Sequence, residues 1–176
     1  MRKHILITGE RGIGKSTLLR ALLKSNTRPL AGFYTKRLDP DETGFHPIYI
    51  HPAAAMKEIC SEENLIGTCN SKIHHVNSEV FETLGCAYLQ ASTGQLIVMD
   101  ELGFMEAKSE RFCSAVKAAL DGDIPVIAIL KNRTDIPFLM ELRAHPNAEV
   151  YTLTEENRDA VRRQLEAVLT SWNREC

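Results

Sequence analysis

Two pairs of polar residues, one at the end of a glycine-rich stretch and one after an apolar run, have the types and spacing needed for phosphoryl chemistry. Lys15 and Ser16 complete the pattern Gly-x-x-x-x-Gly-Lys-Ser, which starts at Gly9. Asp100 and Glu101 follow the run Leu-Ile-Val-Met. A lysine so placed can reach terminal phosphates, a serine hydroxyl and an aspartate can bind Mg²⁺, and a neighbouring glutamate can activate water. These residues predict Mg²⁺-assisted chemistry on a nucleoside triphosphate.

The glycine-rich stretch predicts a phosphate-binding loop between a strand and a helix. Glycines let successive backbone N–H groups turn toward one anion, and the helix that follows adds the positive end of its dipole. A plain connecting turn is the alternative, but it leaves the polar pairs unexplained. The residues expected to bind the nucleotide here are Gly9, Glu10, Arg11, Gly12, Ile13, Gly14, Lys15, Ser16 and Thr17.

The second pair follows an apolar strand predicted over 95–99, as in the Walker B pattern. We expect Asp100 to bind Mg²⁺ together with Ser16, and Glu101 to act as the catalytic base with Lys15 as the other catalytic residue. Two acids at the end of a strand can also simply face solvent. The phosphate-binding loop in the same chain favours the metal-site interpretation.

A parallel sheet has to bring these residues together. A strand over 3–8 and a helix over 15–24 flank the loop, and buried strands over 95–99, 125–130 and 149–153 alternate with amphipathic helices. This rhythm predicts a three-layer α/β fold with a mostly parallel central sheet and right-handed crossovers. Ligands bind beyond the carboxyl ends of such strands. The polar residues that follow the strands are therefore expected at one rim.

The remaining segments predict additions to this sheet. Runs over 32–38 and 45–50 predict an antiparallel hairpin, and Pro47 predicts that its second strand lies at an edge. A short helix is predicted over 53–59 and a strand over 72–76. Further helices are expected to start at the capping residues Ser78, Ser109, Asp135 and Thr154.

Catalysis also needs a cation where negative charge develops on the phosphate. The candidates are Arg11, Arg37, Lys131, Arg133 and Arg158, and the sequence does not choose among them. Asn157 and Arg158 are candidate contacts to the nucleotide. Asn157 is the third residue after Thr154, however, so it can instead complete a helix cap.

Length and composition indicate one ordinary globular unit. The 176 residues are expected to form a single domain, 1–176, and a monomer. The net charge of -2 gives no electrostatic reason to expect a nucleic-acid partner. The first apolar run is too short for a membrane span. Five scattered cysteines without metal-site spacing favour the reducing cytoplasm.

Three strings, together with the phosphate loop, carry a resemblance to a known family. They are Gly-Phe-Tyr-Thr at 32–35, Val-Met-Asp-Glu-Leu-Gly-Phe-Met-Glu at 98–106 and Thr-Glu-Glu-Asn-Arg-Asp at 154–159. In this order they resemble the small P-loop nucleoside-triphosphatases, which include the cancer-related nucleoside-triphosphatase and its prokaryotic relatives. The resemblance spans nearly the whole chain, although residues 51–71 are not recognisable. The family usually has Ile where Leu102 stands and often Leu where Ala107 stands.

The resemblance implies a RecA-like sheet, with one strand between those that carry the two motifs. It also implies slow, Mg²⁺-dependent hydrolysis of several nucleoside triphosphates, ATP and GTP among them, to the diphosphates. The glutamate next to Asp100 favours water as the acceptor. A nucleoside or nucleotide kinase, and a binding switch timed by hydrolysis, remain the alternatives.

Overall fold

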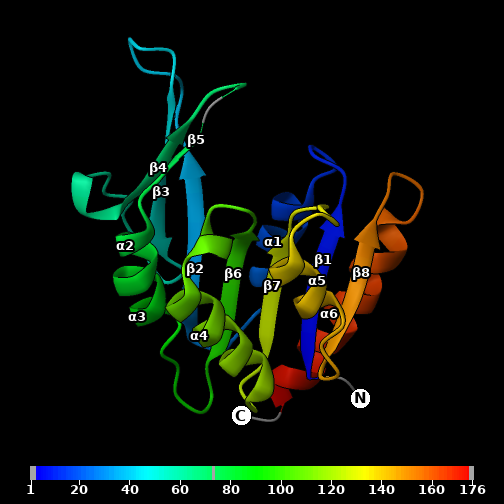
Figure 1. The fold of residues 1–176 in the computed structure, drawn as a ribbon. Helices are drawn as coiled ribbons and strands as arrows, with labels where there is room; N and C mark the ends of the chain where they lie inside the picture. Colours follow the sequence, from blue (N-terminus) through cyan, green and yellow to red (C-terminus); the bar gives the residue numbers. More distant parts are fainter. Residues whose placement is uncertain (1–2, 73, 175–176) are drawn as a thin grey trace.

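Eight strands form one sheet at the centre of the molecule (Figure 1). The computed structural model describes residues 3–72 and 74–174. Across the sheet the strands follow the order β5-β4-β3-β2-β6-β7-β1-β8. Their bounds are β1 His4–Gly9, β2 Leu30–Arg37, β3 His46–Pro52, β4 Leu65–Cys69, β5 His74–Val76, β6 Leu96–Leu102, β7 Val126–Leu130 and β8 Ala148–Leu153.

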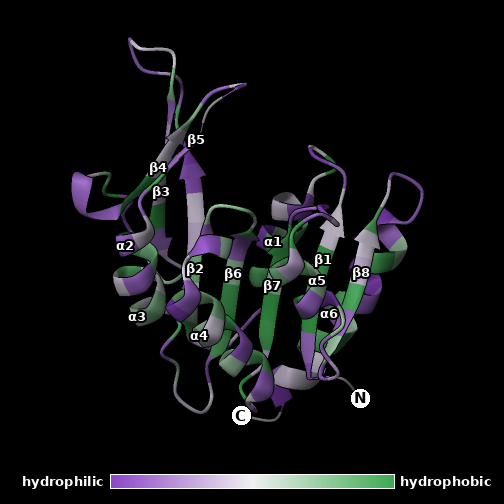
Figure 2. Ribbon diagram, in the orientation of Figure 1, coloured by the Kyte–Doolittle hydropathy of each residue, from purple (hydrophilic) through white to green (hydrophobic). Residues whose placement is uncertain are grey.

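The strands β2, β6, β7, β1 and β8 run parallel to one another, as the alternation of strands and helices predicts. β7 lies between β6 and β1, which is the RecA-like order that the resemblance implies. Ile5 and Ile7 of β1 pack into one core, and Leu6 between them packs into the other. Because both faces are buried, these strands are continuous apolar runs. Figure 2 shows hydrophobic residues through the middle of β6, β7 and β1.

Helices cover both faces of the sheet, so the fold has the three predicted layers. On one face, Leu19 and Leu22 of α1 share a core with Leu165 and Leu169 of α6. The other face packs against α4, α5 and the helical segment 78–88, whose middle is a π-helical turn. The helical elements are α1 Lys15–Leu23, η1 Glu62–Asn64, α2 Ser78–Val80, η2 Phe81–Gly85, α3 Cys86–Tyr88, η3 Glu106–Lys108, α4 Glu110–Asp121, α5 Pro137–Arg143 and α6 Arg158–Arg174.

No helix in the described part of the chain has the length and apolar character required to cross a bilayer.

The antiparallel part of the sheet is larger than predicted. The hairpin of β2 and β3 is confirmed, but β4 and β5 extend it. The prediction that Pro47 marks an edge strand is wrong, because β3 lies between β2 and β4. The Pro47 carbonyl oxygen accepts a hydrogen bond from the Leu38 N–H at 2.9 Å. In this antiparallel pairing the Pro47 nitrogen also faces Leu38, but it carries no hydrogen to donate. The ring Nδ1 of His46 lies 2.9 Å from the Leu38 oxygen and can replace that missing donor.

Two further local predictions are wrong, and a third is confirmed only in part. Residues 53–59 form turns and bends rather than a helix, and Met56 in this segment is 97% exposed, so no apolar stripe is buried there. The strand predicted over 72–76 is shortened to β5 and runs antiparallel to β4, while residue 73 lies outside the described residues. Asp135 pairs with Arg133 instead of capping α5. α5 begins with a proline, which has no N–H to cap.

Candidate functional site

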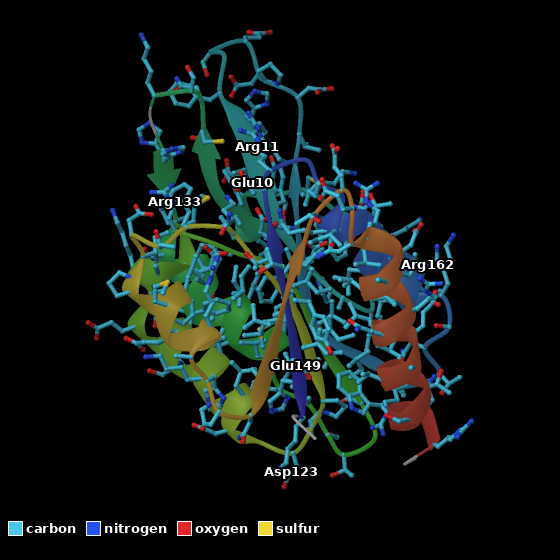
Figure 3. The ribbon with its side chains drawn as sticks, turned by 90° about the vertical axis from the view of Figure 1, so that its right-hand side faces the viewer. Glu10, Arg11, Asp123, Arg133, Glu149 and Arg162 are labelled. Carbon is cyan, nitrogen blue, oxygen red and sulfur yellow. The ribbon has the colours of Figure 1, made fainter. Side chains whose placement is uncertain are left out.

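The loop between β1 and α1 has the form of a phosphate-binding loop. β1 ends at Gly9, which has a φ of 139°, and a Cβ there would lie 2.5 Å from the Leu153 carbonyl oxygen of β8. The position therefore requires glycine. Glu10 and Arg11 lie exposed toward the tip of the loop (Figure 3). The unpaired N–H groups at the start of α1, which begins at Lys15, lie behind the loop and favour a bound anion.

The ammonium group of Lys15 is held by the loop itself. Its Nζ donates to the carbonyl oxygens of Gly9 and Glu10, each at 2.9 Å, and the residue is only 8% exposed. A lysine ammonium has three donors, so one remains for a ligand. The local backbone thus holds a positive charge at the centre of the loop, as the motif predicts.

Ser16, in the first turn of α1, meets Asp100 of β6, although 84 residues separate them in the chain. The Ser16 hydroxyl donates to Oδ1 of Asp100 at 3.0 Å. Asp100 is 8% exposed, and burial raises the pKa of its carboxyl group. The hydrogen bond from Ser16 and the positive charges of Arg20 and Lys15 act in the opposite direction. The parallel-sheet argument therefore placed these two residues correctly.

This pair fits a hard divalent cation. Both side chains offer oxygen atoms, which Mg²⁺ prefers, and a cation would stabilise the buried carboxylate. Within residues 3–72 and 74–174 no group of three or more His, Cys, Asp and Glu side chains could hold a metal. Mg²⁺ needs no such group, because it is usually bound through one or two protein ligands, substrate phosphates and water.

Glu101 follows Asp100 at the same end of β6 and raises the pKa of that neighbour by its charge. Its Oε1 lies 3.4 Å from Nζ of Lys131, the residue that follows β7. The same Lys131 Nζ lies 5.1 Å from the centroid of the Phe104 ring, a cation–π contact. Two neighbouring strands therefore hold the predicted base at the rim.

Glu106 is a buried acid near Glu101 and Lys131 for which the sequence analysis predicted no role. It is 4% exposed, and burial raises the pKa of its carboxyl group to about 7. The charge of Lys131 and a hydrogen bond from the backbone of Gly103 oppose that shift. Its place in the Asp-Glu-Leu-Gly-Phe-Met-Glu string was the available signal, but the string does not show that the side chain turns inward.

The candidate cations have different surroundings. Lys131 pairs with Glu101, as described above. Arg133 is occupied by Asp135, with Nε 2.7 Å from Oδ1. Arg158 donates to the Ile13 carbonyl oxygen of the phosphate loop at 2.8 Å. Arg11 is exposed on that loop, and Arg37 is the exposed last residue of β2. Lys131 and Arg158 are therefore the two candidates with contacts to the predicted site.

Arg143 of α5 is a further cation at this rim that the sequence did not place. It donates to the Thr8 hydroxyl at 3.0 Å and to the Lys131 carbonyl oxygen at 3.1 Å. It also contacts Oδ1 of Asn132 at 3.3 Å, while the amide of Asn132 donates to the Glu10 carboxylate at 2.9 Å. Arg143 thus connects the ends of β1 and β7. Nothing in the local sequence of α5 indicates this contact.

Asn157 serves the local backbone. Its Oδ1 accepts from the Thr154 N–H at 2.8 Å, its N–H lies 3.3 Å from the Thr154 hydroxyl, and its amide donates to the Thr152 carbonyl oxygen at 2.8 Å. This is the reciprocal capping arrangement that the spacing allowed. Its polar side-chain atoms are used in these bonds, which favours the capping alternative. Arg158, in contrast, reaches the phosphate loop.

Comparison with known proteins identifies the family of this chain. A family model described as NTPase matches residues 4–166. The chain is 30% identical over 179 residues to the nucleoside-triphosphatase THEP1 of Aquifex aeolicus, covering 97% of this chain and 99% of that protein. It is 28% identical over 191 residues to the cancer-related nucleoside-triphosphatase homolog of Mus musculus, covering 97% and 98%.

Solved structures agree with these matches. The crystal structure of THEP1 from Aquifex aeolicus superposes with a TM-score of 0.73 at 26% identity, over 94% of this chain and 98% of that one. The solution structure of a human cancer-related nucleoside triphosphatase has a TM-score of 0.67 at 23% identity, over 96% and 98%, and shares the fold. The matched residues include the phosphate loop, Asp100 and Glu101. The chain therefore belongs to the NTPase family.

Proposed function

We propose that this member of a nucleoside-triphosphatase family hydrolyses nucleoside triphosphates, ATP and GTP among them, to the diphosphate and phosphate in an Mg²⁺-dependent reaction. The observation that carries the proposal is the 3.0 Å hydrogen bond from Ser16 to Asp100 beside the buried Lys15. A loop that bound phosphate only for stability would not need a buried carboxylate facing its serine.

In this reaction the backbone of residues 9–17 and the ammonium of Lys15 bind the phosphates. Ser16 and Asp100 hold the cation, which when bound neutralises phosphate charge. The Glu101 carboxylate accepts a proton from a water molecule while the oxygen of that water forms a bond to the γ-phosphorus. The bond from the γ-phosphorus to the β-phosphate oxygen breaks, and the diphosphate leaves. Lys131 orients the Glu101 carboxylate through the ion pair between them.

The positive side chains at the rim support the same assignment. Arg158 lies against the loop backbone at Ile13, where it can approach the nucleotide. Arg143 holds the ends of β1 and β7 together through Thr8 and the backbone of Lys131. Fixed charges of this kind stabilise a transition state because they need no rearrangement as negative charge develops.

We also propose that the protein acts as a monomer in the cytoplasm and without a nucleic-acid partner. The net charge of -2 supports the last point. Free cysteines support a reducing compartment, since Cys60, Cys69, Cys86 and Cys113 are all unpaired. The mass of the protein in solution, measured by light scattering, tests the monomer.

A product-resolved assay tests the function. Purified protein is incubated with each common nucleoside triphosphate and Mg²⁺ or with excess EDTA, and the nucleotides are separated by chromatography. We expect equal amounts of diphosphate and phosphate with Mg²⁺ and almost none with EDTA. Equal turnover in both conditions contradicts the metal assignment. Diphosphate that forms only when a nucleoside or monophosphate acceptor is added, with the transferred phosphate found on the acceptor and not free in solution, contradicts hydrolysis.

A further inference from the structure

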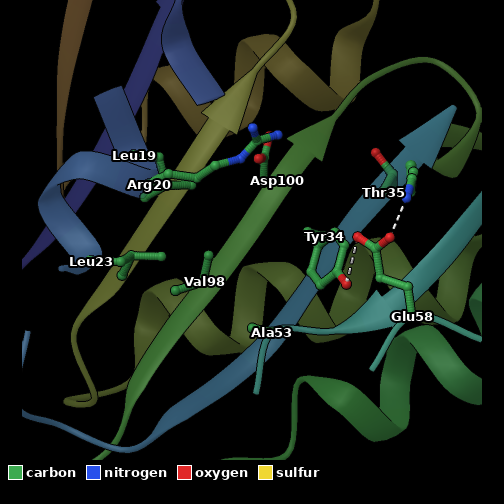
Figure 4. Close-up of a pocket in the computed structure, with 10 residues that line it drawn as sticks. Leu19, Arg20, Leu23, Tyr34, Thr35, Ala53, Glu58, Val98 and Asp100 are labelled. Carbon is green, nitrogen blue, oxygen red and sulfur yellow. Dashed lines mark hydrogen bonds and ion pairs between the residues drawn. The ribbon is translucent and has the colours of Figure 1, made fainter. Parts of the chain in front are cut away.

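A pocket of about 530 Å³ opens beside Asp100, between α1, β2, β6 and the segment that follows β3 (Figure 4). Its volume lies within the range of about 300–1,000 Å³ that is typical of small-molecule sites. Leu19 and Leu23 of α1 and Val98 of β6 form an apolar wall, while Arg20, Tyr34 and Glu58 offer polar groups. This combination of an apolar wall and a few polar side chains is typical of binding sites.

The pocket adjoins the end of the site where the γ-phosphate would lie. Asp100 belongs both to the pocket and to the proposed metal pair. Arg20 follows Ser16 by four residues on α1, so the two side chains lie on the same face of the helix. A second molecule in the pocket would therefore meet the terminal phosphate of a bound nucleotide. This placement rests on the proposed function.

Arg20 is the available cation of the pocket. Figure 4 shows its guanidinium group extended toward Asp100, and in the described part of the chain this group makes no hydrogen bond or ion pair with a side chain or the backbone. The other cation of the pocket, Lys36, is already paired with Glu58. A guanidinium binds a phosphate through two parallel hydrogen bonds, which makes Arg20 suited to an anionic ligand.

Tyr34 provides a fixed planar surface. Its ring stacks on His51 with centroids 5.1 Å apart and an interplanar angle of 23°, and its hydroxyl donates to Glu58 at 3.3 Å. Figure 4 shows the ring at the side of the pocket. Tyr34 also pairs with Asp100 in the register of β2 and β6. An aromatic ligand can pack against such a ring in an offset or edge-on arrangement.

The Gly-Phe-Tyr-Thr string, which the hydrolytic site does not use, forms the part of β2 that lines the pocket. Gly32 has a φ of 94°, and a Cβ there would lie 1.9 Å from the Val98 carbonyl oxygen, so only glycine lets β2 approach β6 so closely. Phe33 is buried in the core. Tyr34 and Thr35 then line the pocket. The pocket thus accounts for Tyr34 and Thr35, whereas Gly32 and Phe33 are explained by the packing of β2.

We propose that this pocket binds a second small molecule, an aromatic phosphomonoester of the nucleoside monophosphate class. Arg20 binds its phosphate next to the Ser16–Asp100 pair, Tyr34 packs against its base, and the Glu58 carboxylate can accept hydrogen bonds from its sugar hydroxyls.

Calorimetric titration of protein already saturated with MgADP tests the proposal, because the first ligand keeps the probe out of the phosphate loop. The probes are AMP, GMP, CMP and UMP. Two fragments serve as controls: adenosine, which lacks the phosphate, and ribose 5-phosphate, which lacks the base. We expect at least one monophosphate to bind one equivalent, and to bind at least tenfold more tightly than either fragment. Failure of MgADP to bind counts against the proposed function. Normal MgADP binding without any monophosphate binding overturns this proposal alone.

Variants then locate the bound monophosphate. Arg20→Met removes the guanidinium from an exposed position, and we expect a loss of affinity of about tenfold or more, as for a charge-assisted pair. Ala53→Leu adds bulk inside the pocket, whereas Ala54→Leu adds the same bulk at an exposed neighbour. We expect only the first of these to abolish binding. Unchanged affinity in Arg20→Met, or equal losses in the two leucine variants, contradicts the assignment.

Discussion

The substitution Glu101→Gln replaces one carboxylate oxygen with an amide nitrogen and leaves the side chain nearly the same shape. In the folded protein Glu101 pairs with Lys131 at 3.4 Å, and the two side chains are 30% and 39% exposed. An ion pair with this exposure contributes about 0.2–1 kcal/mol. We therefore expect the free energy of unfolding to fall by about 1 kcal/mol or less.

The expected effect on catalysis is much larger. A general base contributes roughly 10²–10⁴-fold to the rate, which corresponds to about 2.7–5.5 kcal/mol in the activation free energy. The small loss of stability cannot produce a decrease of this size, because a protein destabilised by about 1 kcal/mol remains almost entirely folded. Nucleotide binding should be retained, since Lys15 and the loop backbone are untouched.

Steady-state phosphate release with MgATP, combined with a titration of MgADP and a urea unfolding curve, measures the three quantities on one preparation. Glu141→Gln is the matched control, because Glu141 is also an ion-paired, partly exposed glutamate, bound to Lys117 on the helical face. We expect its kcat to stay within about twofold of the wild type. A wild-type kcat in Glu101→Gln, or equal losses in both variants, would refute the assignment of Glu101 as the base.

Three further substitutions test other parts of the structure. Gly9→Ala places a Cβ 2.5 Å from the Leu153 carbonyl oxygen at a φ of 139°, so urea unfolding should show a loss of about 1–3 kcal/mol. Asp100→Asn removes a charged oxygen ligand, so Mg²⁺ titrations of activity should show a maximal rate at least about tenfold lower. Burial raises the pKa of Glu106 to about 7, whereas the usual pKa of a glutamate is 4.5. Between these two pH values the folded protein keeps a proton on Glu106 that the unfolded chain has released. The free energy of unfolding should therefore contain a component that falls as pH rises from about 4.5 to 7. Unfolding curves across this range should lose that component in Glu106→Gln.

The predictions that failed concern segments whose structure depends on distant partners. Pro47 lies in an interior strand because the neighbouring ring of His46 can donate where the proline cannot. The segment 53–59 is irregular, and its Glu58 bonds to side chains of β2. Asp135 is of a residue type that often caps helices, but its carboxylate pairs with the guanidinium of Arg133. In each case a side-chain partner outweighed the backbone preference.

By itself the sequence determined the phosphate loop, the parallel core and the meeting of Ser16 with Asp100, because these follow from residue type, apolar periodicity and the common rim of parallel strands. Only the tertiary structure decided that Arg143 contacts Thr8 and that Arg20 and Tyr34 face one pocket. Such contacts depend on how helices and strands pack across long chain separations, and this packing leaves no periodic signal in the local sequence.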